Sequence, residues 1–163
     1  MRTLYLVRHA SASIDSPTRK DIDRALNHDG IAEAEIMAKY LRKQNAQINL
    51  IVSSTALRAY TTSIIFAKHF FYPIPEIRRE ESIFLNNAEN DFSLLSSMED
   101  VIENILFVGH NPSITQLANS LSDTSISSFK PAGIACIEFE IEKWEQLSEK
   151  GALRFYTDPA LVM

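Results

Sequence analysis

The chain has 163 residues, of which 45% are hydrophobic and 23% are charged. This length allows one substantial core and this composition excludes a disordered chain, so we expect one domain over residues 1–163. The 16 lysines and arginines are outnumbered by 21 acidic residues, and the formal net charge of -5 argues against a nucleic-acid partner. Cys136 is the only cysteine, which excludes intramolecular disulfides and also the phosphatases that use a Cys-x5-Arg loop.

The N-terminal apolar stretch is interrupted by Arg8 after only a few residues. It is therefore too short for a signal peptide or a membrane span. We expect a cytoplasmic protein that has no membrane partner.

Short apolar runs alternate with helical patterns through the first two thirds of the chain. The runs at 3–7, 50–53 and 105–108 predict buried parallel strands. Residues 30–44 place apolar side chains at helical spacing with charges opposite, which predicts a helix between the first two strands. Residues 56–70 can form another helix after the second strand.

Shorter elements are predicted after the second helix. Residues 76–79 favour a short strand and residues 90–98 a weaker helix. Asn111 and Pro112 are typical of the N-cap and first turn of a helix, which we expect to run through about Leu121.

The C-terminal third has a different pattern. Residues 134–141 alternate between apolar and polar side chains, and with residues 153–156 they predict an antiparallel pair of strands at the edge of the sheet. The serine-rich residues 120–128 predict a surface loop. The fold class expected is α/β: a three-layer α/β/α sandwich whose mixed sheet is mostly parallel, with an antiparallel edge strand.

Charged and imidazole side chains follow three of the predicted strands. Arg8 and His9 follow the first strand, Arg58 comes just after the second, and His110 follows the third. Because the carboxyl ends of parallel strands meet at one edge of a sheet, we expect these four side chains to converge there. Two guanidinium groups suit the oxygens of a phosphoryl group, and a neutral imidazole can attack phosphorus. His9 is the better placed nucleophile.

Two other kinds of site fit these residues less well. A metal site built from His9, His110 and a carboxylate lacks both the His-x-x-His and the His-Glu-x-x-His spacing. The Asp21-Ile22-Asp23 segment is similar to the start of an aspartyl-phosphatase motif, but it follows charged residues rather than a hydrophobic strand.

The segments LVRHA, SSTALRAYTTS and VGHNP resemble the histidine phosphatase superfamily. DIDRALNHDG, IFLNNAEND and FKPAGIACIEFE are similar to its SixA phosphohistidine phosphatase branch. The resemblance implies a phosphoglycerate mutase-like fold and a reaction that needs no metal, and we expect no other cofactor. No connection between the predicted elements is long enough to form a lid insertion over the site. The resemblance also implies that His9 is phosphorylated transiently, that Arg8 and Arg58 bind the phosphoryl oxygens, and that His110 completes the pocket.

The chain departs from the family pattern at Ala10, where glycine is usual, and at Ala25, where the branch often has proline. Larger members of the family use a carboxylate after the third strand as the acid that protonates the leaving oxygen. Glu81 is the residue that this comparison selects here. Glu80 lies in the same region, and Asp21 and Asp23 are candidates from the first loop.

The expected substrate is a protein that carries phosphohistidine. An imidazole leaves more readily than an alkoxide, and a chain without a lid predicts a shallow, open pocket that admits a side chain on a protein surface. Two alternatives stay open: a phosphatase of small phosphate esters, and a phosphate-binding interaction module that has no catalytic activity.

Overall fold

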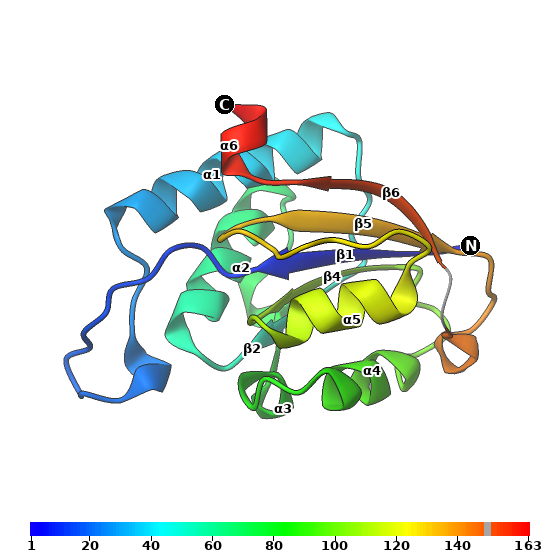
Figure 1. The fold of residues 1–163 in the computed structure, drawn as a ribbon, viewed down its shortest axis with the longest axis horizontal. Coiled ribbons are helices and arrows are strands. Elements are labelled where there is room, and N and C mark those ends of the chain that lie inside the picture. Colours follow the sequence, from blue (N-terminus) through cyan, green and yellow to red (C-terminus); the bar gives the residue numbers. More distant parts are fainter. Residues whose placement is uncertain (149–150) are drawn as a thin grey trace.

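The short apolar runs form the strands of one sheet in the computed structural model, which describes residues 1–148 and 151–163. The strands are β1 (Arg2–Arg8), β2 (Leu50–Ser54), β3 (Arg78–Glu80), β4 (Asn104–Gly109), β5 (Ile134–Phe139) and β6 (Ala152–Thr157). Their order across the sheet is β3-β2-β4-β1-β5-β6. The first four strands in this order are parallel, and β5 and β6 are antiparallel to their neighbours. The predicted mixed sheet is confirmed (Figure 1).

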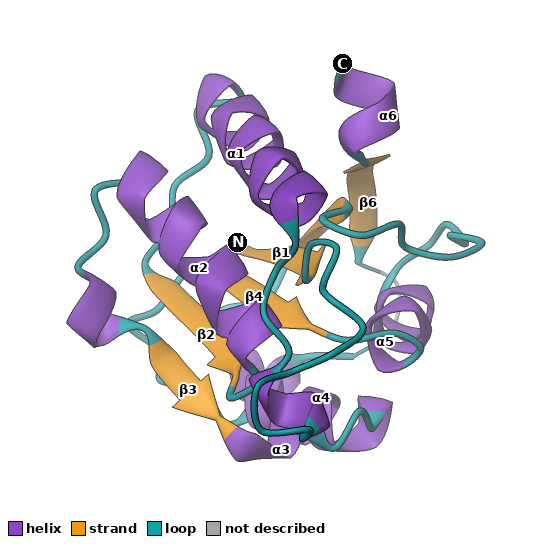
Figure 2. Cartoon of the chain, turned by 90° about the vertical axis from the view of Figure 1, so that its left-hand side faces the viewer, coloured by secondary structure: helices purple, strands orange, loops and turns teal. Residues whose placement is uncertain are grey.

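Helices cover both faces of the sheet. They are α1 (His28–Lys43), α2 (Leu57–His69), α3 (Glu81–Phe84), α4 (Ala88–Ser96), α5 (Ser113–Leu121) and α6 (Pro159–Val162). Short 3-10 helices occur at η1 (Asp21–Asp23), η2 (Ile74–Glu76) and η3 (Trp144–Gln146). Figure 2 shows α1 and α2 on one side of the sheet and α3, α4 and α5 on the other. Among the described residues, no helix has the length and apolar character needed to cross a membrane.

Alternation along β1 builds a core on each face. Leu4 and Leu6 are fully buried in the cluster that also receives α4 and α5, whereas Tyr5 and Val7 belong to the cluster formed with α1 and α2. Successive side chains of a strand point to opposite faces, so a strand covered on both faces is apolar at every position. This is why the central strands read as continuous apolar runs.

The predicted start of the helix that corresponds to α5 is wrong by one residue. Pro112, not Asn111, is the N-cap of α5. The side chain of Asn111 is used elsewhere, because its Oδ1 accepts from Thr115 Oγ1 at 2.7 Å and its Nδ2 donates to the Phe129 carbonyl at 3.1 Å. The helix ends at Leu121, so only the later part of the serine-rich stretch is irregular, and Ile126 within it is buried.

The C-terminal strands form an antiparallel pair as expected, but only β6 is an edge strand. β5 lies between β1 and β6 and is buried at most of its positions. The polar residue that suggested an edge, Glu138, pairs with Arg154 of β6 at 3.1 Å. The charged partner Arg154 therefore explains why β5 has a polar residue although it is not at the edge of the sheet.

Candidate active site

The carboxyl ends of β1, β2 and β4 lie side by side at one edge of the sheet (Figure 1). Arg8 is the register partner of Gly109, so His9 and His110 follow their strands at matching positions. The His9 amide donates to the Gly109 carbonyl at 3.1 Å. Arg58 lies in the first turn of α2, shortly after β2. The structure thus brings together the strand-end residues that were expected to converge.

The His9 ring has one defined donor and one nitrogen without a proton. Its Nδ1 lies 2.7 Å from the Ala10 carbonyl, which can only accept, so the proton is on Nδ1 and Nε2 is left without one. Burial is the main cause that lowers the pKa of His9 to about 4, and the charges of Arg58, Arg8 and Arg24 contribute. At neutral pH the imidazole is therefore uncharged, with its Nε2 available as a nucleophile.

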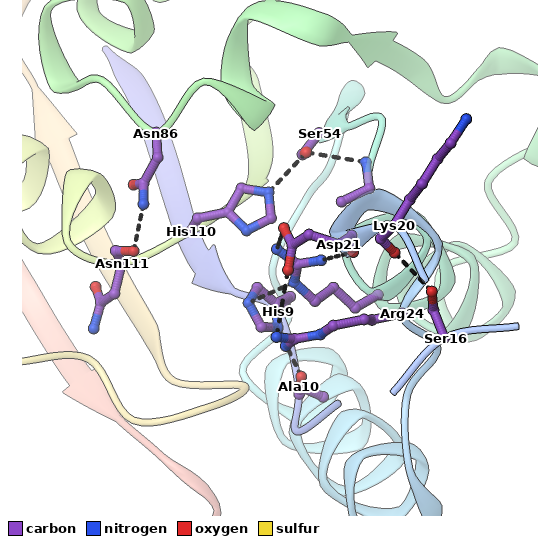
Figure 3. A network of polar contacts seen from close by, with 12 residues as sticks. His9, Ala10, Ser16, Lys20, Asp21, Arg24, Ser54, Asn86, His110 and Asn111 are labelled. Atoms are coloured by element: carbon purple, nitrogen blue, oxygen red, sulfur yellow. Dashed lines mark hydrogen bonds and ion pairs between the residues drawn. The ribbon is translucent and has the colours of Figure 1, made fainter. Parts of the chain in front are cut away.

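His110 lies across from His9. The two ring centroids are 5.1 Å apart in an edge-to-face arrangement. A 2.8 Å hydrogen bond joins His110 Nε2 to Ser54 Oγ, and that oxygen also accepts from the Ala56 amide (Figure 3). His110 is 4% exposed, and burial, followed by the positive potential of His9 and Arg58, lowers its pKa to about 3. The ring is therefore uncharged at neutral pH.

The two arginines are held by carbonyl and carboxylate oxygens. Arg8 donates through Nη1 to the Phe129 carbonyl at 2.8 Å. Arg58 donates through Nη1 to the Asp21 carbonyl at 2.8 Å and through Nη2 to Asp21 Oδ2 at 3.1 Å. Its Nε lies 3.4 Å from His9 Nε2. Fixed cationic groups beside an uncharged imidazole form an environment suited to an anion.

The segment between β1 and α1 makes this site less open than the sequence suggested. Arg58 is only 7% exposed, and Asp21 in η1 lies against its guanidinium. Arg24, which the sequence reasoning did not single out, places its Nη1 3.4 Å from Asp21 Oδ1. The spacing of three residues between Asp21 and Arg24 in a tight turn is the sequence signal that could have identified Arg24.

The predicted acid, Glu81, begins α3 directly after β3 and is exposed. Among the described residues, no hydrogen bond or ion pair joins its carboxylate to Arg8, His9, Arg58 or His110. Asp23 instead accepts from Thr18 Oγ1 at 2.5 Å, so Asp21 is the candidate carboxylate that contacts the arginine. Within the described part of the chain, no cluster of three or more His, Cys, Asp or Glu side chains could hold a metal ion.

Neighbouring segments fix the backbone of the site. The Ala10 amide donates to Thr62 Oγ1 at 3.1 Å, which ties the end of β1 to α2. Ala10 is fully buried and is absent from the non-glycine residues with positive φ, so its methyl group is accommodated where the family usually has glycine. On the other side, Asn86 donates to the Asn111 carbonyl at 2.6 Å and accepts from the Ser113 amide at 3.0 Å.

Comparisons with known proteins agree with this geometry. Residues 4–81 match the family model described as histidine phosphatase superfamily (branch 1). An uncharacterized chloroplastic protein of Arabidopsis thaliana is 30% identical over 89% of this chain and 70% of its own length. The crystal structure of a putative phosphohistidine phosphatase SixA from Agrobacterium tumefaciens has a TM-score of 0.80 and 26% identity, covering 97% of this chain and 99% of that one. The protein histidine phosphatase SixA complexed with tungstate has a TM-score of 0.76 and 19% identity, with 97% of each chain covered.

Proposed function

The chain belongs to the histidine phosphatase superfamily and is a phosphatase, and from this premise we propose that it hydrolyses phosphohistidine on proteins through a phosphorylated His9, without a metal ion. The observation that carries the proposal is the state of His9. Its Nδ1 proton is held by the Ala10 carbonyl, and its unprotonated Nε2 lies 3.4 Å from the Nε of Arg58. A nucleophile and an oxygen-binding group thus face the same small volume.

In the first step, His9 Nε2 attacks phosphorus. The bond between phosphorus and the leaving nitrogen of the substrate breaks, its electron pair stays on that imidazole nitrogen, and the nitrogen takes a proton from solvent. Arg8 and Arg58 bind the equatorial oxygens, where each charged hydrogen bond contributes roughly 1.5 to 3 kcal/mol. His110, which lies across from His9, completes the pocket around the phosphoryl group.

In the second step, water attacks phospho-His9 on phosphorus. The bond between phosphorus and Nε2 breaks, the electron pair returns to the ring, and inorganic phosphate leaves. The hydrogen bond from Nδ1 to the Ala10 carbonyl keeps the ring oriented in both steps. The guanidinium groups supply positive charge that a metal ion supplies in other phosphatases.

Two features support a protein substrate. The first is the likeness to a putative phosphohistidine phosphatase over nearly the whole chain. The second is the construction of the edge: the connections after β2, β3 and β4 are short, so none of them forms a lid over the site. A site without such a lid can admit a side chain projecting from a protein surface, and it offers few contacts to a free sugar phosphate.

Substrate preference tests this proposal. We expect kcat/KM for a phosphohistidine protein to exceed that for phenyl phosphate by at least about a hundredfold, because the imidazole leaves without help from an acid. Both assays contain a chelator, and we expect activity to persist. A preference for phenyl phosphate would instead make the protein a phosphatase of small esters, and loss of activity in the chelator would contradict a metal-free reaction.

The same assay with His9→Ala provides the control. We expect activity to fall by about three orders of magnitude or more. Phosphate binding with no turnover in the unaltered protein would indicate an interaction module and would overturn the proposal.

A further inference from the structure

Asp21 makes the contact that a bound phosphoryl group needs. Its carboxylate oxygen Oδ2 is 3.1 Å from Arg58 Nη2, and its carbonyl oxygen is 2.8 Å from Arg58 Nη1. With Nε directed at His9, every nitrogen of the Arg58 guanidinium already has a partner within the protein. One N–H on each Nη remains for a phosphoryl oxygen, but the Asp21 carboxylate beside them repels that oxygen and neutralises part of the positive charge that would bind it.

The carboxylate is the partner most easily replaced. The Asp21 carbonyl also accepts from the Arg24 amide, within the turn of η1, so the backbone is fixed. The side chain is 56% exposed, in contrast to 8% for the side chain of Arg58, and it needs only a rotation to leave. Exposed ion pairs contribute little, so displacement has a modest cost.

A second arginine holds the carboxylate after it leaves. Arg24 Nη1 lies 3.4 Å from Asp21 Oδ1, the carboxylate oxygen that does not bond Arg58 (Figure 3). The carboxylate therefore stays at the mouth of the site while the phosphoryl group occupies Arg58. It returns when product phosphate departs.

We propose that Asp21 belongs to the phosphoryl-binding site as an internal competitor, which occupies Arg58 in the free protein and weakens the binding of substrate and product phosphate alike. The inference rests on the proposed function because it takes Arg58 as a phosphoryl ligand. It assigns Asp21 a role in affinity, distinct from that of the acid that protonates a leaving group.

The test compares Asp21→Asn with Asp23→Asn. The two aspartates lie in the same short helix and the two changes remove the same charge, but Asp23 bonds Thr18 and not Arg58. Calorimetry with inorganic phosphate is expected to give about five- to tenfold tighter binding in Asp21→Asn and no change in Asp23→Asn. KM for phenyl phosphate should fall by a similar factor, with kcat changed by less than about threefold.

Each result decides between the alternatives. Equal phosphate affinity in Asp21→Asn and the unaltered protein would overturn the proposal. A fall in kcat of about a hundredfold or more for phenyl phosphate would also overturn it, because it would identify Asp21 as a proton donor. If the unaltered protein does not bind phosphate at all, the proposed function fails, whereas unequal affinities support the competitor role whichever phosphate ester is the natural substrate. Circular dichroism of both variants establishes that they are folded.

Discussion

At the scale of single residues, the site depends on two imidazoles that are kept uncharged. His9 is half-buried and His110 is buried, and cationic groups lie near both rings, so protonation of either ring is disfavoured. Arg8, His9, Arg58 and His110 could be predicted to lie together because parallel strands fix where their ends meet. Arg24 could not, since its position depends on the path of a loop that has no periodic pattern. The roles of the four residues and of Glu81 stay predictions.

Titration of His9 tests the electrostatics of the nucleophile. We expect the NMR signal of its ring to show a protonation midpoint near pH 4, because burial and nearby guanidinium groups disfavour the charged form. The neutral ring is then present throughout the range from about pH 5 upward. The spectrum of His9→Gln assigns the signal, and a midpoint near the ordinary value of about 6.5 would contradict this account.

The lowered pKa of His9 also predicts how stability changes with pH. The unfolded chain takes up a proton on this ring near pH 6.5, whereas the folded protein does so only near pH 4. Stability should therefore fall as the pH drops from about 6.5 to 4. In urea denaturation, His9→Gln should lose less stability than the unaltered protein over this interval, and parallel losses would contradict the shift.

At the scale of elements, the connection between α3 and α4 supports the loop that carries His110. Asn86 has a φ of 57°, a left-handed conformation that asparagine tolerates better than most residues. From this position its amide bonds both the Asn111 carbonyl and the Ser113 amide. The sequence did not reveal this support because it depends on contacts between segments far apart in the chain.

Replacing Asn86 by glycine tests this support without adding backbone strain. We expect kcat/KM to fall by about tenfold, since the loss of both hydrogen bonds lets His110 move relative to His9. Asn45→Gly is the matched control, because Asn45 also has a φ of 57° and lies exposed at the end of α1. Equal activity of Asn86→Gly and the unaltered protein in steady-state assays would show that the loop does not need this support.

Buried Asp91 makes α4 sensitive to pH. Its side chain is fully buried, and among the described residues neither carboxylate oxygen has a hydrogen-bond partner. Burial raises the pKa of Asp91 to about 7, and the nearby Ser113 hydroxyl, which donates to the His110 carbonyl, offsets only part of this. Because the unfolded chain releases this proton near pH 4, the carboxylate costs increasing stability between about pH 4 and pH 7.

The Asp91→Asn variant has no titrating carboxyl group at this position, so it should not show this loss of stability. We expect its advantage in free energy of unfolding over the unaltered protein to grow by about 2 to 3 kcal/mol between pH 5 and pH 8. Urea denaturation at the two pH values measures the change. Glu89→Gln, on the exposed surface of the same helix, should change stability by less than about 0.5 kcal/mol, and an advantage of Asp91→Asn that does not depend on pH would contradict the assignment.

At the scale of the whole molecule, a sheet covered on both faces determines where the chemistry lies. Both core clusters are packed beneath helices, so polar groups are free to gather only beyond the strand ends. Periodicity predicted the layers and most helices, because burial on one or two faces imposes it on the sequence. It placed β5 at the edge because a single charged pair, Glu138 with Arg154, imitates the pattern of an exposed strand.

The central claim is that a phosphoryl group passes through His9. To test it directly, the protein is mixed with a radiolabelled phosphohistidine protein and the reaction is stopped rapidly without acid. Mass spectrometry of the resulting peptides then locates the phosphate. The account predicts an acid-labile phosphate on His9 that is absent in His9→Ala and equally abundant in a protein treated with chelator. Turnover with no label on His9, or with label at another residue, would contradict it.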